Sequence, residues 1–161
     1  SISIGGDHCA CLDNGGNVFT FGDNDGKIFA FCKNKFGLLG TGDEISYTHI
    51  PQKVNLPPCI QVACGYTFSI CLSNDGMLYS FGENYFGYLG IGSNERNFYS
   101  PQKIKSLKNV EIVRCGGHHV VCKTSNGRIY SWGYNGRGQL GLGNTKDQRS
   151  PILCSSLSNE E

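Results

Sequence analysis

Cysteine and histidine are the residues of this chain with the clearest potential for chemistry. The 161 residues include nine cysteines, and His8, Cys9 and Cys11 lie close together near the start. Thiolate and imidazole groups bind zinc, but the spacings lack the paired C-x-x-C of a zinc module. An odd number of cysteines also disfavours a complete disulfide framework. We place Cys9 and Cys11 on alternate positions of a strand, equivalent to Phe68 and Ile70, and predict free structural thiols in a reducing compartment and no metal site.

A second pattern matches a nucleotide-binding loop. Residues 136–141 read Gly-Arg-Gly-Gln-Leu-Gly, which fits the dinucleotide fingerprint G-x-G-x-x-G. That fingerprint works only when a helix follows, because the helix N-terminus holds the pyrophosphate. Leu142-Gly143-Asn144 follows instead, and this is poor helix material. We therefore interpret the segment as a structural turn and expect no cofactor.

The sequence also shows no pair of acidic and basic residues that is placed for catalysis. The acidic residues fall in turns and loops, where carboxylates ordinarily bond the backbone. His118 and His119 are adjacent, so on a strand their side chains point in opposite directions. We expect one of them to be a turn histidine that bonds backbone groups. The sequence predicts that this chain is not an enzyme.

Composition and charge limit the kinds of partner. The net charge is +1, which gives no overall attraction to nucleic acid or to anionic membranes. Lys103, Lys105 and Lys108 form a local basic run without interleaved aromatic residues, so we interpret it as a solvated face. No apolar run reaches membrane-spanning length. We expect a cytoplasmic or nuclear location, no membrane partner, and no nucleic acid or nucleosome partner.

One sequence motif occurs three times along the chain. Residues 34–42, 84–92 and 135–143 each begin with Asn and share the spacing Gly-x-Leu-Gly-x-Gly. The interval from Gly40 to Gly90 is 90 − 40 = 50 residues, and the interval from Gly90 to Gly141 is 141 − 90 = 51 residues. Self-similarity at a fixed period of this length is typical of repeat architectures.

Each period contains several short strands. Aromatic and small residues alternate in 28–31, 78–81 and 129–132, and this period of two predicts a strand. A turn signal of the Asn-Gly or Asp-Gly type precedes each of the three. Further alternating segments bring the total to about four strands per period, with no helical pattern. Radial repetition of four-stranded antiparallel sheets is a β-propeller, so we predict an all-β fold.

The motifs of the third period resemble a known family. Residues 115–119 read Cys-Gly-Gly-His-His, residues 126–135 read Asn-Gly-Arg-Ile-Tyr-Ser-Trp-Gly-Tyr-Asn, and residues 138–143 read Gly-Gln-Leu-Gly-Leu-Gly. They are similar to the repeat of the regulator of chromosome condensation. The resemblance implies a seven-bladed ring, of which this chain holds about three blades, with repeats at about 1–58, 59–109 and 110–161. The missing blades of the same ring are then expected partners.

The first period is longer than the others. We measure 65 − 6 = 59 residues from Gly6 to its expected counterpart Gly65, against 51 from Gly65 to Gly116. The excess arises because residues 16–25 are echoed by residues 26–35. One interpretation is a neutral duplication that adds a hairpin arm. The alternative is a protruding hairpin for binding, with Phe19 and Phe21 as candidate contacts.

The loops that differ between periods are the remaining candidates for binding. On a rigid scaffold such loops carry function, and Phe or Tyr beside Arg is typical of interface anchors. They lie within 41–50, 93–100 and 144–150 and supply the candidates Tyr47, His49, Arg96, Phe98, Tyr99, Lys146 and Arg149.

Three functions are compatible with these patterns. The first is a protein–protein interaction propeller within a larger protein. The resemblance to the family also implies guanine-nucleotide exchange on a Ran-like small GTPase as an alternative, in which the propeller stabilises the nucleotide-free state without covalent chemistry. Chromatin binding is a second alternative, which the near-neutral charge disfavours.

Overall fold

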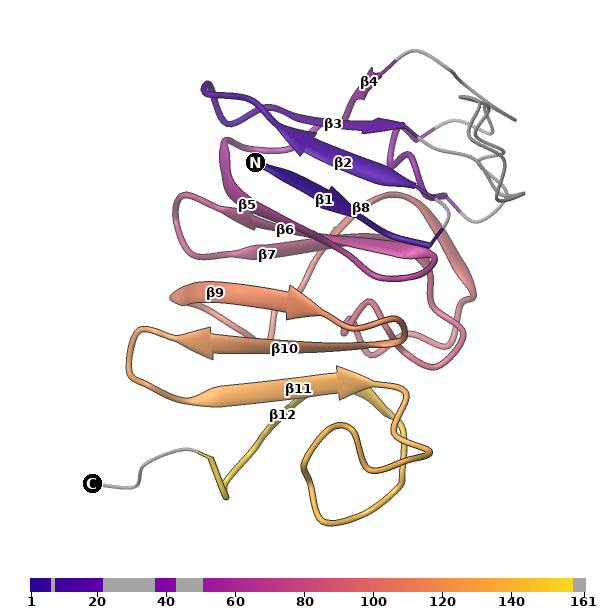
Figure 1. Ribbon diagram of the computed structural model, residues 1–161, viewed down its shortest axis with the longest axis vertical. Coiled ribbons are helices and arrows are strands. Elements are labelled where there is room, and N and C mark those ends of the chain that lie inside the picture. The colour runs from indigo at the N-terminus through magenta and orange to yellow at the C-terminus, as the bar shows by residue number, and fades with distance from the viewer. Residues whose placement is uncertain (7, 22–36, 43–50, 158–161) are drawn as a thin grey trace.

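The protein consists of three four-stranded antiparallel sheets stacked face to face (Figure 1). This computed structural model describes residues 1–6, 8–21, 37–42 and 51–157. Blade 1 contains β1–β4, blade 2 contains β5–β8 and blade 3 contains β9–β12. The strands are β1 Ile2–Ile4, β2 Cys9–Leu12, β3 Val18–Phe21, β4 Gln52–Lys53, β5 Cys59–Cys64, β6 Phe68–Ser73, β7 Leu78–Glu83, β8 Asn97–Lys103, β9 Val110–Cys115, β10 His119–Thr124, β11 Ile129–Gly133 and β12 Gln148–Leu153.

The predicted all-β propeller architecture is confirmed. Consecutive strands pair within each sheet, and the first strands β1, β5 and β9 contact one another from blade to blade. The described residues contain no helix, and hence none long and apolar enough to cross a membrane. The β5–β6 turn, the β9–β10 turn and the long β7–β8 and β11–β12 loops lie on one side of the stack, at the right in Figure 1. We call this side the loop face.

Hydroxyl groups fix the turn that follows the third strand of every blade. Ser80 Oγ donates to the carbonyl of Leu89, and Ser131 Oγ donates to the carbonyl of Leu140, at 2.9 and 2.8 Å. In blade 1 the same bond runs from Thr20 Oγ1 to Leu39 O at 2.8 Å. All three donors are fully buried, so each bond satisfies a carbonyl that water cannot reach. The sequence had indicated only that this position is small.

That bond explains which copy of the duplicated segment enters blade 1. We had assigned the strand to 28–31, but the third strand of the sheet is β3, Val18–Phe21. Thr20 can donate to the turn carbonyl, whereas Ala30, the matching residue of the echo, has no hydroxyl. Residues 28–31, and with them most of the proposed extra hairpin, lie outside the described residues.

Two registers predicted for blade 1 were wrong by one residue. The turn glycine that donates to the carbonyl three residues on is Gly5, as Gly65 and Gly116 do in blades 2 and 3, so Gly6 is not their counterpart. Cys9 pairs with Phe21 as Ser69 pairs with Phe81. Cys9 and Cys11 are therefore equivalent to Ser69 and Cys71. The second glycine of the Gly5-Gly6 pair had concealed this register.

Aromatic residues of one blade pack on turn glycines of the blade before it. A Cβ added at Gly40 would lie 2.7 Å from the Phe81 ring, and one at Gly90 would lie 2.6 Å from Trp132 Nε1. Both glycines have positive φ, +63° and +68°. Gly141 has the same φ of +68°, but within the described structure nothing lies within 4 Å of its added Cβ. Each of these two aromatic rings thus requires a glycine opposite it, and no described residue occupies the corresponding place beside Gly141.

Candidate protein-binding face

The loop face brings some predicted binding residues together and separates others. Arg96 lies over the ring of Tyr85, with its guanidinium carbon 5.0 Å from the ring centroid. Arg149 donates to the carbonyl of the same tyrosine at 3.0 Å. Lys146 is exposed in the β11–β12 loop. Tyr47 and His49 lie outside the described residues.

The other predicted contact residues that the structure describes belong to strands β3 and β8. Phe98 is half-buried against the core and lines a hollow of about 390 Å³ beside β8. The carbonyl of Tyr99 accepts a hydrogen bond from Gly42 N of blade 1 at 2.8 Å. Phe19 lies half-buried in β3, between its strand partners Cys11 and Lys53. Phe21 ends the same strand.

Arg149 holds two blades together. Its guanidinium donates to the carbonyls of Asn84 and Ser93, each at 3.3 Å, as well as to Tyr85. These acceptors belong to the β7–β8 loop of blade 2, whereas Arg149 belongs to β12 of blade 3. Three carbonyls across a blade junction give this arginine a stabilising role in the fold.

Asparagines shape the two long loops in the same way. Asn84 Nδ2 donates to Ser93 O and Glu95 O at 3.1 and 3.0 Å, while its Oδ1 accepts from Leu89 N. Asn135 does the same in blade 3, with Asn144 O and Lys146 O as acceptors. Both asparagines are buried, so their amide groups replace water as the loops' hydrogen-bond partners. The loops are therefore held rigidly enough to present side chains.

A row of aromatic rings crosses the junction of blades 2 and 3 on this face. His118 lies between Tyr66 and Tyr88, with ring centroids 5.5 and 5.3 Å away. Phe86 continues the row, 5.9 Å from Tyr88 and 4.9 Å from Tyr134. Tyr66 and Tyr85 are the most open of these rings, 53% and 45% exposed. We give the name aromatic row to the set formed by Tyr66, Tyr85, Phe86, Tyr88, Arg96, His118 and Tyr134.

Two carboxylates flank the centre of the row. Glu83, the last residue of β7, accepts the Thr67 hydroxyl at 2.5 Å. Asp147 accepts the N–H of Asn135 at 2.7 Å. Burial raises the pKa of Tyr88, and the charges of Glu83 and Asp147 raise it further.

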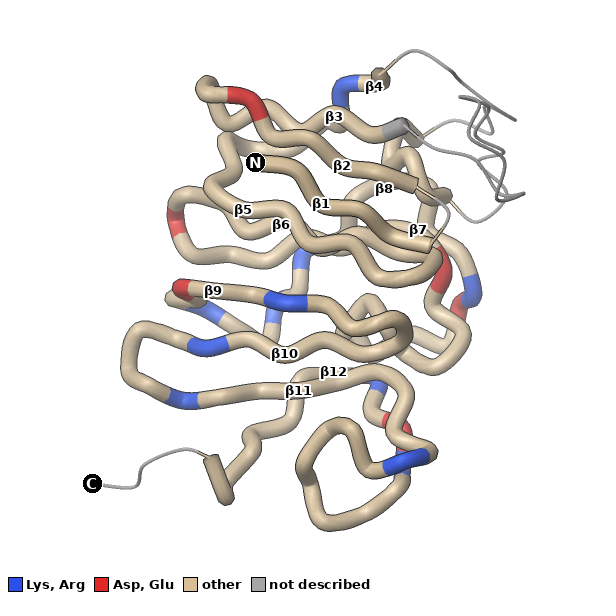
Figure 2. The backbone as a smooth tube through the Cα atoms, viewed as in Figure 1, with Lys and Arg blue, Asp and Glu red and all other residues tan. Residues whose placement is uncertain are grey.

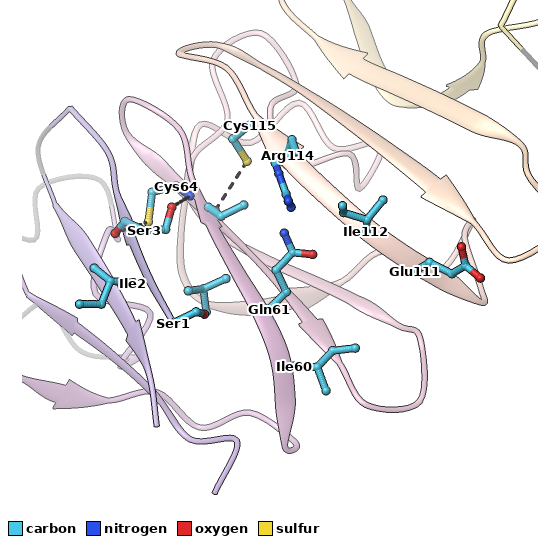
Figure 3. A pocket seen from close by; sticks show the side chains of 12 residues that line it. Ser1, Ile2, Ser3, Ile60, Gln61, Cys64, Glu111, Ile112, Arg114 and Cys115 are labelled. Atoms are coloured by element: carbon cyan, nitrogen blue, oxygen red, sulfur yellow. Dashed lines mark hydrogen bonds between the residues drawn. The ribbon is translucent and has the colours of Figure 1, made fainter. Parts of the chain in front are cut away.

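The inner strands form a separate groove of about 490 Å³ (Figure 3). Gln61 reaches from β5 towards β9, where its amide donates to Val113 O at 2.6 Å and accepts from Val113 N at 3.2 Å. Arg114 NH1 donates to the same carbonyl at 2.9 Å. Ile60 and Ile112 line the groove with exposed apolar surface. Gln61 thus joins blades 2 and 3, and Ser3 Oγ, which accepts from Cys64 N at 2.9 Å, joins blades 1 and 2.

The thiol and imidazole groups do not assemble into a metal centre within the described residues. The eight cysteines in that part of the chain form no disulfide with one another. Burial raises the pKa of Cys64 to about 11 and that of Cys122 to about 12, so these thiols are poor nucleophiles at neutral pH. His8 is buried between blades, with Nε2 2.6 Å from Ser69 Oγ, and burial lowers its pKa to about 4.

A second group of basic residues lies apart from the aromatic row and its arginines. Figure 2 shows Lys and Arg residues of blade 3 along β9, β10 and the β10–β11 hairpin. Lys123 and Arg128 belong to this group, and both are exposed. The hairpin lies on the side of the stack opposite the loop face (Figure 1). Lys103, from the basic run seen in the sequence, has its ammonium 6.0 Å from the Tyr79 ring centroid.

Sequence reasoning missed most of the aromatic row. Tyr66 and His118 occupy the short β5–β6 and β9–β10 turns, which the pattern presented only as glycine punctuation. Phe86 and Tyr88 stand at variable positions inside the repeated Asn–Gly turn. The sequence did contain one indication of their role, which is a difference between periods. The positions of Phe86 and Tyr88 in the second period are occupied by Arg137 and Gln139 in the third.

Comparisons with known proteins agree with the repeat. The sequence profile described as "Regulator of chromosome condensation (RCC1) repeat" matches residues 25–72, 75–122 and 126–161. The chain is 30% identical to RCC1 domain-containing protein RUG3, mitochondrial, of Arabidopsis thaliana, across 100% of the chain and 36% of that protein. It is 34% identical to the probable E3 ubiquitin-protein ligase HERC6 of Homo sapiens, across 83% of the chain and 14% of that protein.

A solved structure gives the same architecture. The crystal structure of Prp20p from Saccharomyces cerevisiae, described with its binding properties to Gsp1p and histones, superposes with a TM-score of 0.81 at 26% identity. The match covers 99% of the chain and 38% of Prp20p. The chain thus spans little more than a third of the length of RUG3 and Prp20p.

Proposed function

Because this chain belongs to the regulator of chromosome condensation repeat family, we propose that it is part of a larger β-propeller that binds protein partners through its loop face. The aromatic row carries this proposal. Tyr66 and Tyr85 expose large rings. Buried Asn84 holds the loop that carries Tyr85, and the backbone N–H of Tyr66 donates to Gly117 O at 2.8 Å. Aromatic and arginine side chains on a rigid surface are typical anchors of protein interfaces. Such a surface is suited to binding a protein rather than to catalysis.

The test compares two surfaces of the same molecule. The loop-face variant Tyr66→Ser/Tyr85→Ser/Arg96→Ser removes the exposed anchors, and Lys123→Ser/Arg128→Ser removes charge from the opposite side. Quantitative cross-linking in an extract of the source cells should show proteins that bind the parent chain and the second variant but not the first. Equal cross-linking to all three chains would contradict a loop-face partner.

Guanine-nucleotide exchange on a Ran-like small GTPase is a second candidate. Its support is the likeness to Prp20p, a protein described with its binding to Gsp1p. Exchange needs binding to the GTPase but no covalent chemistry by the propeller. Release of a fluorescent GDP analogue from a Ran-like GTPase measures it, and the full-length protein should accelerate that release. Unchanged release would leave the interaction function and remove exchange.

We infer that further blades complete the ring. The open space beside Gly141 is where Gly40 and Gly90 meet an aromatic ring of the following blade. Ile2 and Ile4, at the other end, are 71% and 73% exposed. Both ends therefore have surfaces that a neighbouring blade would cover. Consistent with the family, we infer a cytoplasmic or nuclear location, although RUG3 is named as mitochondrial.

A further inference from the structure

We propose that Ser150 is a phosphorylation site for a proline-directed protein kinase, and that its phosphate occupies the hollow shared by β8, the β7–β8 loop and β12. Ser150 precedes Pro151 in β12, and Ser100 precedes Pro101 at the equivalent place in β8. The proposed loop-face binding does not depend on this serine, so the inference goes beyond that function and can fail separately.

Ser150 lies where β12 is open to another protein. β12 is an outer strand of blade 3, because the order in that sheet is β12-β11-β10-β9. The register shifts between Ser131 and Gly133, which leaves residues 149–151 bulged opposite Trp132. The serine is exposed, and the proline that follows has no N–H to give to a sheet. A kinase can therefore engage this segment without competing for a ladder pair at the serine.

A glycine faces the serine hydroxyl across the blade junction. A Cβ added at Gly92 would lie 3.2 Å from Ser150 Oγ, so a larger residue there would crowd the hydroxyl. Ser131 of the same blade is different, since it is fully buried and its hydroxyl donates to Leu140 O at 2.8 Å. Ser150 therefore has the open hydroxyl that phosphoryl transfer requires, whereas Ser131 does not.

The hollow beside Ser150 offers groups that bind phosphate. Its volume is about 390 Å³, and Ser150 lines it from blade 3 while Lys103, Lys105 and Ser106 line it from the side of blade 2. Among the described residues that line it, Glu95 is the only acid, so the two lysines leave an excess of positive charge. Phosphoserine carries a charge of about −1.5 to −2 at pH 7 and accepts charge-assisted hydrogen bonds from ammonium groups. The phosphate would therefore join blade 3 to blade 2.

The transfer uses ATP as the phosphoryl donor, and the chain supplies the acceptor. Ser150 Oγ attacks the γ-phosphorus of ATP, the bond from that phosphorus to the β,γ-bridging oxygen breaks, and ADP leaves. The hydroxyl proton passes to the catalytic carboxylate of the kinase. Proline-directed kinases select the residue after the acceptor for its missing N–H, which Pro151 provides.

Phosphate incorporation tests the site. The folded chain is incubated with ATP and either a mitogen-activated or a cyclin-dependent protein kinase, and the phosphate on each serine is measured by mass spectrometry. We expect phosphate on Ser150 and a reaction about tenfold slower in Pro151→Ala. Ser155, which is exposed but followed by another serine, is the internal control and should stay unmodified.

Two results would overturn the site. One is the absence of phosphate on Ser150 with both kinases, or equal rates with and without Pro151. The other is phosphate on a peptide of residues 145–156 but not on the folded chain, which would show that the fold closes β12 to kinases.

Thermal denaturation tests the place of the phosphate. In a Ser100→Ala background, which leaves Ser150 as the acceptor, phosphorylation should raise Tm by about 3 °C because the phosphate links two blades. The rise should disappear in Lys103→Gln/Lys105→Gln and persist in Lys123→Gln/Arg128→Gln, whose charges lie outside the hollow. An unchanged Tm on phosphorylation, or a rise that survives the loss of Lys103 and Lys105, would contradict binding in the hollow.

Discussion

The junction between blades 1 and 2 and the junction between blades 2 and 3 share one plan but differ in their polar contacts. In both, a turn glycine faces an aromatic ring, Gly40 with Phe81 and Gly90 with Trp132. Only the second junction adds a hydrogen bond from that ring, Trp132 Nε1 to Tyr88 O. It also has Arg149 on the β7–β8 loop, whereas the first has the buried contact between His8 and Ser69.

The comparison distinguishes contacts that recur at every junction from contacts that are particular to one pair of blades. Glycine opposite an aromatic ring recurs because the ring fills the space that a Cβ would occupy. Backbone hydrogen bonds also recur, such as Gly42 N to Tyr99 O and Gly92 N to Arg149 O. The side-chain contacts of His8, Trp132 and Arg149 do not recur, so each junction has its own response to mutation and to pH. The predictions below follow that comparison from the largest expected effect to the smallest.

Replacing the glycine should be costly only where a following blade is present. Gly90→Ala would place a Cβ 2.6 Å from Trp132 Nε1 in a left-handed backbone conformation. We expect a loss of about 4 kcal/mol in the free energy of unfolding, measured by urea denaturation.

Measured in the 161-residue chain without further blades, Gly141→Ala is the matched control, because its φ is the same and its Cβ meets nothing within 4 Å in the described structure. It should cost about 1 kcal/mol, from backbone strain alone. Equal losses for the two variants would show that packing against the next blade is not what selects glycine.

Acid should weaken the first junction through His8. Its pKa is lowered to about 4 in the fold, so the unfolded chain binds a proton first as pH falls below 6.5. Stability is therefore full above pH 6.5 and is lost progressively down to about pH 4, by about 3 kcal/mol from this group.

The control for this pH dependence is His8→Phe, which copies Phe68 at the equivalent position of blade 2. Urea denaturation at pH 7 and pH 4.5 should show a smaller difference in the variant than in the parent chain. An unchanged difference would assign the acid sensitivity to other groups.

Trp132→Phe should make the second junction resemble the first. The change removes the donor to Tyr88 O and leaves that buried carbonyl and part of the ring's volume unfilled. We expect a loss of about 2 kcal/mol in the free energy of unfolding. A variant as stable as the parent would mean that the indole hydrogen bond contributes nothing to the difference between junctions.

Arg149→Lys should have the smallest effect. Lysine keeps the charge but cannot reach three carbonyls with a planar fork, so a loss of about 1 kcal/mol is expected in thermal denaturation. Lys146→Arg in the neighbouring exposed position is the control and should leave Tm unchanged. A larger loss in the control would contradict the assigned role of Arg149.

The repeat made the fold predictable, but it could not identify the copy used in blade 1. Spacing alone predicted the three periods and the strands of blades 2 and 3, because these periods have the same turn glycines. Residues 18–21 and 28–31 have the same alternating texture, so no rule of periodicity distinguishes them. Val18–Phe21 forms β3, and its Thr20 makes a tertiary contact to Leu39 O that periodicity does not predict.

The binding face was predictable only where residues stood in variable loops. Arg96 was identified in this way and does lie on an aromatic ring. Tyr88 was not, because an aromatic residue within a repeated turn is as consistent with core as with surface. Glu83 was interpreted as one of several turn acids, and its hydrogen bond to the Thr67 hydroxyl is a contact that the repeat pattern does not reveal.

The hydroxyl-to-carbonyl bonds have a consequence for how the chain is made. Thr20 with Leu39, Ser80 with Leu89 and Ser131 with Leu140 each join residues of a single blade. Each turn can therefore take its shape as soon as its own residues have left the ribosome, before the next blade exists. Synthesis from the N-terminus then adds blades one after another to a finished surface, so a stalled or shortened chain would end in an ordered turn.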